Sequence, residues 1–212
     1  MKPALFKTAV LLASFCAQVH ATGLSSLERF VKNVSTGRAE FTQVVTSPPK
    51  DGQAARSKTS SGSFEFSRPN RFKFIYKKPF AQSIVADGQT LWLYDVDLNQ
   101  VTARQQAKAL GATPAALIAA APDLRALQVE YTLSDEPDKD GLQWLAATPK
   151  SKDNPLQSVR IGFKADVLAE LDMLDSFGQK SVIRFLGFEA NVKLSPGSFE
   201  FKPPVGADVI RQ

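Results

Sequence analysis

Hydrophobic and polar residues alternate with a period of two along most of this chain, and the alternation is strongest between residues 62 and 102. The aromatic residues there share one parity within each run: Phe64 and Phe66, then Phe72, Phe74 and Tyr76. Because successive side chains of a strand point to opposite faces, each run places its aromatic residues on one face. Turn-forming dipeptides such as Asp87-Gly88 separate the runs.

The same period recurs over the rest of the chain, and most neighbouring segments are joined by short, turn-rich links. We expect strands at 39–45, 62–67, 71–76, 82–86, 90–94, 100–103, 129–134, 142–148, 156–164, 168–175, 180–188 and 198–201. Short links join antiparallel neighbours, whereas parallel strands need long crossovers. The pattern therefore predicts a mainly β, antiparallel fold. The polar segment 47–61 predicts an exposed hairpin loop.

Two segments show helical spacing instead. Residues 25–34 place Leu27, Phe30 and Val31 on one face, with Ser25 or Ser26 as the expected cap. Residues 113–121 begin with a Thr cap and a Pro at the first helical position, and Pro122 ends them. Residues 123–127 suggest one more turn. Such short helices are marginal alone, so we expect them to cover a sheet.

Some strands are apolar on both faces, as in segments 90–94 and 182–188. An antiparallel sheet usually keeps one face in water. We therefore expect a curled sheet whose concave side is covered by helices. From the residues alone, the inner space is either a filled core or a cavity.

Arg68 has the same parity as Phe64 and Phe66, so an extended chain directs its guanidinium toward their apolar face. A charge there is costly unless it finds hydrogen-bond acceptors. The alternative is an ordinary rim arginine, whose stem is packed and whose head lies in water.

The N-terminus resembles a secretory signal peptide, with Lys2 and Lys7, an apolar run over residues 9–17, and a small residue at Ala21. We expect cleavage after Ala21, which leaves residues 22–212 as a single domain. Cys16 follows the bulky Phe15, which does not fit a lipidation site.

Cleavage would remove Cys16 and His20, the only Cys and His of the chain. The mature protein would then lack disulfides, His or Cys metal sites, Cys nucleophiles and His-based triads, so we expect no enzyme. The acidic pair Asp135-Glu136 is interpreted as solvated loop charge. Several strands are too short and too charged for a membrane-embedded barrel.

The formal charge would fall from +5 to +3 with the loss of Lys2 and Lys7. No long basic run remains, which argues against nucleic-acid binding.

Several motifs occur in a defined order: AEFTQ at 39–43, GSFEFSRPNRFKFIY at 62–76, IVADGQTLWLYDVDLNQVT at 84–102, ATPAALIA at 112–119 and SFEFKPPVGADV at 198–209. Together they resemble the periplasmic outer-membrane lipoprotein carrier family, LolA, over nearly the whole mature chain. Two positions depart from the family pattern. Gly37 replaces a frequent aromatic residue, and Phe74 stands where many members have Trp.

The resemblance implies a single antiparallel half-open β-barrel with a lid of short α-helices over an apolar cavity. The cavity would take the acyl chains of triacylated lipoproteins and use no cofactor or metal. The residues we expect to line it are Phe41, Phe64, Phe66, Phe72, Phe74, Leu117 and Ile118. In the family, the arginine at the position of Arg68 bonds the lid backbone, so Arg68 is the expected latch.

The resemblance also implies a location in the periplasm, where a monomer would collect cargo from an inner-membrane ABC lipoprotein-releasing complex. It would pass the cargo to an outer-membrane receptor lipoprotein. The alternative is a periplasmic carrier of other lipids or glycolipids with the same fold.

Overall fold

The computed structural model describes residues 21–49, 52–109 and 123–212. Residues 1–20 of the predicted signal peptide lie outside this part. The whole helix predicted at 113–121, with Leu117 and Ile118, lies outside it as well.

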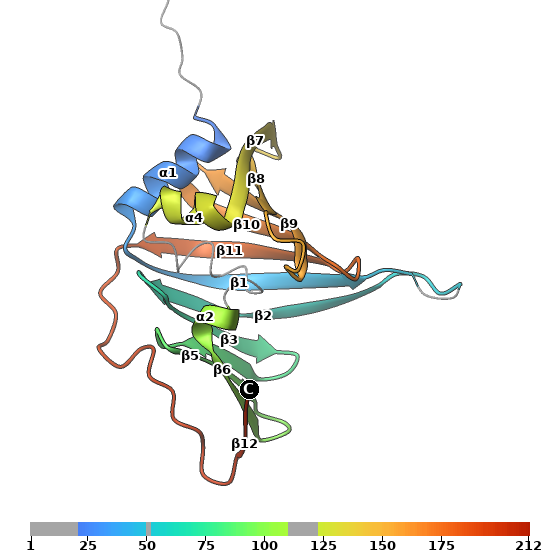
Figure 1. Cartoon of the computed structure of the whole chain (residues 1–212), viewed down its shortest axis with the longest axis vertical. Coiled ribbons are helices and arrows are strands. Elements are labelled where there is room, and N and C mark those ends of the chain that lie inside the picture. Colours follow the sequence, from blue (N-terminus) through green and yellow to red (C-terminus); the bar gives the residue numbers. More distant parts are fainter. Residues whose placement is uncertain (1–20, 50–51, 110–122) are drawn as a thin grey trace, which may run out of the picture.

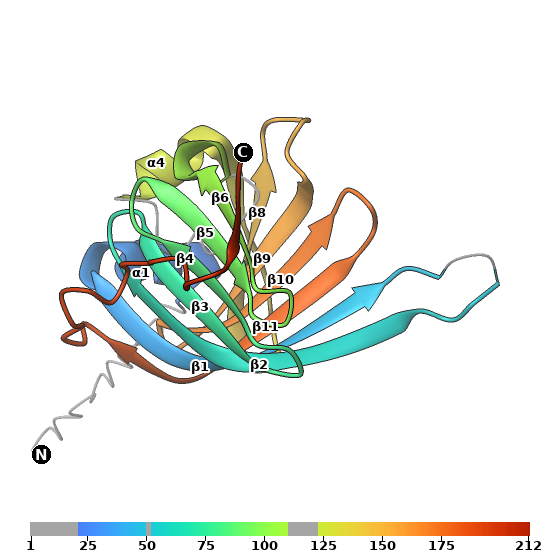
Figure 2. The ribbon, with the colours of Figure 1, turned by 90° about the horizontal axis from the view of Figure 1, so that it is seen from below.

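One open sheet dominates the described chain (Figures 1 and 2). Its strands are β1 (Thr36–Ser47), β2 (Arg56–Ser67), β3 (Arg71–Lys78), β4 (Gln82–Ala86), β5 (Thr90–Asp95), β6 (Gln100–Gln105), β7 (Tyr131–Lys139), β8 (Leu142–Pro149), β9 (Leu156–Lys164), β10 (Val167–Asp175), β11 (Lys180–Ala190) and β12 (Asp208–Arg211). They are ordered β12-β6-β5-β4-β3-β2-β1-β11-β10-β9-β8-β7. The sheet curls strongly, and its two edge strands, β12 and β7, are not paired with each other (Figure 2).

The mainly β, antiparallel prediction is confirmed. Strands β1 to β6 form one meander and β7 to β11 another, and β1 pairs with β11 to join them. The C-terminal strand was predicted wrongly. Residues 198–201 form a turn region, and the last strand is β12, which pairs in parallel with β6. The predicted loop was also too long, because Arg56–Ser61 belong to β2 and pair with β1.

Three helices are described: α1 (Gly23–Asn33), α2 (Gln106–Ala109) and α4 (Leu124–Glu130). The cap of α1 is Thr22 rather than Ser25 or Ser26, and Ser25 completes a capping box with it. Asp123 caps α4, which also takes residues 129–130 from the strand predicted there. Helices α1 and α4 lie against the half of the sheet that holds β7 to β10 (Figure 1).

Apolar side chains on the concave face form the main core together with α1 and Leu127 of α4. A second apolar cluster lies on the convex face, under the segment between β11 and β12. There the Phe201 ring lies 5.4 Å from that of Trp92 and 6.1 Å from that of Tyr94, and Phe199 is buried. Strand β5 is therefore apolar on both faces because a chain segment, not a helix, covers its outer side.

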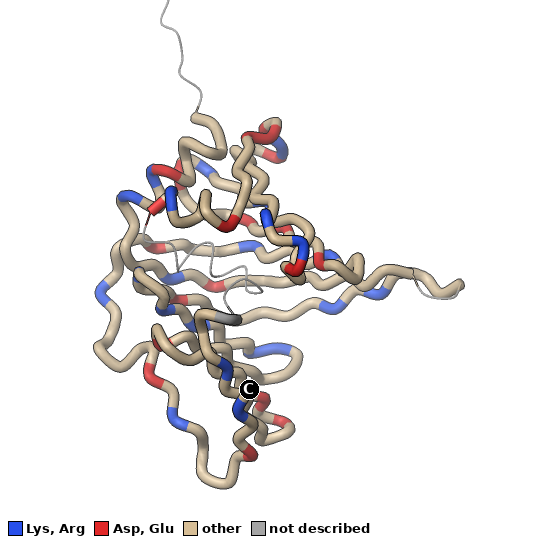
Figure 3. The backbone as a smooth tube through the Cα atoms, in the orientation of Figure 1, with Lys and Arg blue, Asp and Glu red and all other residues tan. Residues whose placement is uncertain are grey.

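Acidic and basic residues are intermingled along the chain (Figure 3). Cross-strand ion pairs account for several of them, such as Lys73 with Glu65 at 3.0 Å and Arg184 with Glu170 at 2.8 Å. Within the described ranges, no helix is both long enough and apolar enough to span a bilayer.

Candidate functional site

Five aromatic residues of β1, β2 and β3 line the concave face. They are Phe41, Phe64, Phe66, Phe72 and Phe74, and each is at most 4% exposed. Their rings are in contact, with centroids 4.5 Å apart for Phe64 and Phe74 and 5.3 Å apart for Phe41 and Phe74. The structure thus brings together all five phenylalanines that the sequence placed in a cavity lining, as a packed apolar surface.

Helix α1 shields the end of this surface nearest the start of β1. Leu27, Phe30 and Val31 turn inward and are buried. The Phe30 ring lies 5.6 Å from that of Phe163, 5.7 Å from Phe188 and 6.1 Å from Phe66. The helix therefore covers this end of the aromatic surface through apolar contacts.

Arg68 lies at the C-terminal end of α1, directly after β2. Its Nη1 donates to the Val31 carbonyl oxygen at 3.2 Å. The guanidinium carbon lies 5.1 Å from the ring centre of Phe30 and 5.4 Å from that of Phe66. Carbonyls in the last turn of a helix have no partner within the helix, so the arginine supplies a donor there.

Burial lowers the pKa of Arg68 to about 10. That value is still far above neutral pH, so the guanidinium keeps its charge in the site. The contacts therefore combine a charge-assisted hydrogen bond with cation–π attraction to two rings.

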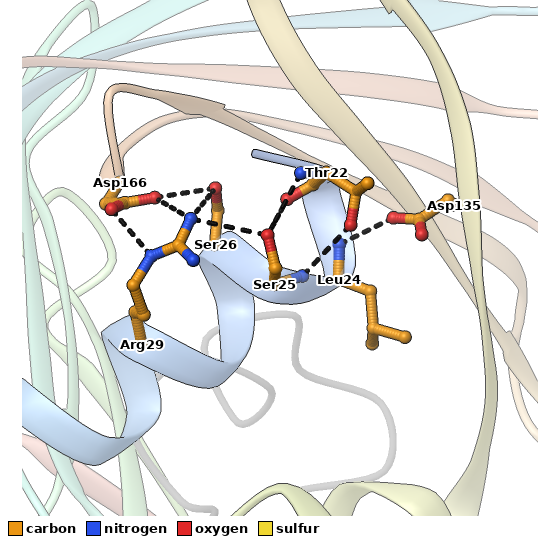
Figure 4. Close-up of polar contacts among 7 residues, drawn as sticks. All are labelled: Thr22, Leu24, Ser25, Ser26, Arg29, Asp135 and Asp166. Carbon is orange, nitrogen blue, oxygen red and sulfur yellow. Dashed lines mark hydrogen bonds and ion pairs between the residues drawn. The ribbon is translucent and has the colours of Figure 1, made fainter. Parts of the chain in front are cut away.

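The other end of α1 is held by carboxylates from the sheet (Figure 4). Arg29 Nε and Nη2 each donate to Asp166 at 2.7 Å, and Ser26 Oγ donates to the same carboxylate at 2.7 Å. The Leu24 amide donates to Asp135 Oδ1 at 2.7 Å. The hydrogen bonds from Arg29 lower the pKa of Asp166. Helix α1 is thus fixed near both ends.

The sequence did not indicate this N-terminal anchor. Asp135 was interpreted as solvated loop charge, which is wrong, because it lies in β7 and accepts from the first turn of α1. Glu136, its neighbour, accepts from Arg160 Nε at 2.6 Å. Asp166 lies in the turn between β9 and β10 at a φ of 65°. Ala165 and Asp166 both have positive φ in this turn, but nothing in the sequence marks α1 as the partner of Asp166.

Two sequence-predicted positions, Leu117 and Ile118, lie outside the described residues. Gly37, where the family often has an aromatic residue, lies close to the Phe66 and Phe188 rings, and a β-carbon there would lie 2.4 Å from Phe66. The glycine therefore makes room for these two rings. Over residues 21–49, 52–109 and 123–212, no group of three or more acidic, His or Cys side chains is placed to hold a metal ion.

Comparison with known proteins gives one consistent picture. The family model described as "Outer membrane lipoprotein carrier protein LolA" matches residues 32–202. A protein of Albidiferax ferrireducens named outer-membrane lipoprotein carrier protein is 71% identical over 207 residues, covering 96% of this chain and 97% of the relative. A protein of the same name from Methylibium petroleiphilum is 52% identical and covers 96% of this chain and 98% of its own length.

Among solved structures, an uncharacterized conserved protein from Thermus thermophilus superposes with a TM-score of 0.52 at 15% identity. The match covers 89% of this chain and 98% of the other. At that identity the likeness supports the fold alone.

Proposed function

Because the chain belongs to the outer membrane lipoprotein carrier family LolA, we propose that it carries lipoproteins across the periplasm with their acyl chains held against the concave aromatic face. The observation that carries the proposal is the packed aromatic surface of Phe41, Phe64, Phe66, Phe72 and Phe74 on the concave face, with Phe30 of α1 against its Phe66 end.

The curled sheet suits this role as a half-open barrel. Its concave side is filled by α1 and aromatic rings rather than by a rigid second sheet. Displacing a helix exposes a lining that is already apolar, so an acyl chain can take its place. The proposed cavity is therefore a space that α1 vacates when cargo binds, and its expected lining includes Leu117 and Ile118, which lie outside the described residues.

The cost of moving α1 offsets a substantial part of the free energy gained from burying one acyl chain. Each acyl methylene taken from water contributes about 0.8 kcal/mol, so one long chain contributes on the order of 10 kcal/mol. Re-exposing Leu27, Phe30 and Val31 costs about 1.5–3 kcal/mol for each side chain. The cost of opening is subtracted from the affinity for cargo. A cover that must be displaced thus lets the carrier bind acyl chains and still release them.

We propose that Arg68 is the latch that holds helix α1 against the aromatic surface. Its hydrogen bond to Val31 and its contact with Phe30 exist only while α1 is in place, because both partners belong to that helix. Opening must break them, and they favour the return of α1. The latch therefore promotes release onto an acceptor rather than tighter binding.

We place the carrier in the periplasm as a monomer, between an inner-membrane ABC complex that releases lipoproteins and an outer-membrane receptor lipoprotein. The support is the family membership together with the predicted signal peptide at 1–21.

The test is a release assay. Residues 22–212 are incubated with spheroplasts that make an outer-membrane lipoprotein, and the supernatant is examined by native mass spectrometry. We expect a complex of one carrier with one triacylated lipoprotein. A matched Phe72→Glu variant, which places a charge on the aromatic face, should release none.

A supernatant without lipoprotein, in which the carrier holds phospholipid or glycolipid, would contradict the proposal. The same concave face would then belong to a carrier of other lipids.

A further inference from the structure

The concave face changes from apolar to polar along its strands. On β2 the inward residues run Phe66, Phe64, Gly62 and Ser60, and then Lys58 and Arg56. The neighbouring strands make the same change along a diagonal of the register. On β3 and β4, Tyr76 and Gln82 follow Phe74 and Ile84 at the level of Gly62. Gln43 follows Phe41 at the level of Ser60, and Ser181 follows Ile183 at the level of Lys58. A polar row thus crosses the concave face just beyond the phenylalanines, at the end of the sheet away from α1.

Three members of the row form a continuous hydrogen-bond relay over three strands. Tyr76 Oη donates to Gln43 Oε1 at 2.9 Å, and Gln43 Nε2 donates to Ser181 Oγ at 2.7 Å. The Tyr76 ring packs edge-on against Phe41, 5.0 Å between centroids. Burial raises the pKa of Tyr76 to about 12, so its hydroxyl is a donor at neutral pH.

Two donors of the relay have no hydrogen-bond partner among the described residues. The amide oxygen of Gln43 accepts the hydrogen bond from Tyr76, so the amide nitrogen faces Ser181. This nitrogen has a second N–H besides the one that it donates to Ser181. Ser181 accepts that bond with its oxygen and keeps its own O–H to donate. A carbonyl oxygen placed beside Gln43 and Ser181 can therefore accept without breaking the relay.

Hollows adjoin the relay on both sides. The larger, about 680 Å³, is lined by Tyr76, Gln43 and Ser60, and the smaller, about 180 Å³, by Gln43, Ser181 and the apolar Met173. The larger volume is in the range of small-molecule sites. Its charged lining is balanced, since Arg56 and Lys58 are accompanied by Asp95 and Asp97. Ser181 lines only the smaller hollow, where the charged residue is Asp175. A neutral polar group therefore suits this site better than an anionic headgroup.

We propose that Gln43 and Ser181, oriented by Tyr76, bind the ester carbonyls that join acyl chains to a glyceryl-cysteine head. This inference rests on the proposed function and adds a binding site to it. The phenylalanines take the hydrocarbon, and the polar row sets how deep it enters. Tyr76 acts as a positioning residue for Gln43.

The experiment compares two synthetic probes, a triacylated cysteinyl peptide with ester-linked glyceryl chains and its analogue in which ethers replace the ester carbonyls. Affinities are measured for wild type, Ser181→Ala and Tyr76→Phe. A neutral hydrogen bond contributes about 1 kcal/mol, so we expect each variant to bind the ester probe about fivefold more weakly. Binding of the ether probe should change less than twofold.

Tyr94→Phe is the matched control, because it removes a hydroxyl from β5 on the convex face, where Tyr94 bonds only to Asn99 among the described residues. It should bind both probes like wild type. Equal losses for both probes, or no loss for either, would overturn the inference while leaving the proposed function intact. Wild-type protein that binds neither probe would overturn the proposed function and this inference with it.

Discussion

Arg68 donates a hydrogen bond to the carbonyl of Val31 across 3.2 Å, and this contact ties the end of β2 to the last turn of α1. The same guanidinium lies over Phe30 of the helix and Phe66 of the sheet. One side chain therefore holds the cover and the surface beneath it together. Whatever moves α1 off the aromatic face must first separate these two residues.

Replacing Arg68 with leucine should favour the loaded form. The leucine keeps an apolar stem between Phe30 and Phe66 but cannot donate to Val31. A hydrogen bond to a charged group contributes about 1.5 kcal/mol, so we expect acyl cargo to leave the variant about tenfold more slowly. The measurement is the rate at which a preloaded fluorescent lipopeptide passes to acceptor vesicles.

Arg71→Leu is the control for this rate. Arg71 is exposed on the convex side, where its guanidinium lies near Phe199. It should release cargo like wild type. Equal rates for Arg68→Leu and Arg71→Leu would remove Arg68 from the latch role.

The anchor at the other end of α1 should depend on pH. Hydrogen bonds from Arg29 and Ser26 depress the pKa of Asp166 in the folded protein. The stabilisation is therefore fully present above the pKa of an unfolded aspartate, about 3.9, and is lost as pH falls through the lower folded value. The pair is substantially exposed, so we expect Asp166→Asn to cost about 1 kcal/mol or less at pH 7.

Urea unfolding of wild type and Asp166→Asn at pH 7 and pH 3 measures this effect. The difference between their free energies of unfolding should be smaller at pH 3. Asp140→Asn serves as the control, since Asp140 also has a positive φ in a hairpin turn but forms no ion pair within the described residues. A gap that is unchanged between the two pH values would show that the charge of Asp166 does not hold α1.

A charge on the aromatic face should abolish cargo binding. Phe72 is fully buried and contacts the Phe74 ring. In Phe72→Glu, the carboxylate either draws water into the site or becomes protonated, and both weaken acyl packing. We expect at least a tenfold loss of lipopeptide affinity, measured by fluorescence titration on protein whose circular dichroism shows a folded sheet.

Ile75→Glu places the same charge on the convex face of the same strand and should bind normally. If both variants bind alike, the cargo does not lie against the concave face.

The concave face was predictable because its signal is local. Phe64, Phe66, Phe72 and Phe74 alternate with polar residues along two adjacent strands, and a turn at 68–70 joins those strands. Arg68 has the same sequence parity as Phe64 and Phe66, which predicted that its side chain points toward the apolar face. These features follow from strand geometry alone and need no knowledge of distant partners.

The anchors and the second apolar cluster were not predictable in the same way. Asp166 is 137 residues from Arg29, and nothing near either residue specifies the other. Strand β12 pairs with β6 across more than a hundred residues of chain, and its four residues carry little periodicity. Phe199 and Phe201 have strand-like parity but lie in irregular chain, where Phe201 packs against Trp92. Such contacts depend on how the whole sheet curls.

The convex cluster should contribute to stability but not to cargo binding. Phe199 is 6% exposed, and it lies on the side of the sheet opposite the aromatic lining. Removing its ring leaves a void that the covering segment fills only in part, so Phe199→Ala should lower the free energy of unfolding by about 3 kcal/mol. Lipopeptide affinity should stay within twofold of wild type, because the concave face is untouched.

Val205→Ala is the matched control in the same segment, since Val205 is fully exposed. Its truncation should change neither the free energy of unfolding nor the lipopeptide affinity. Urea unfolding gives the stability and fluorescence titration gives the affinity. A large loss of affinity in Phe199→Ala at conditions where the protein remains folded would show that the two faces are coupled. The covering segment would then take part in binding, and the cargo site would extend through the sheet rather than end at it.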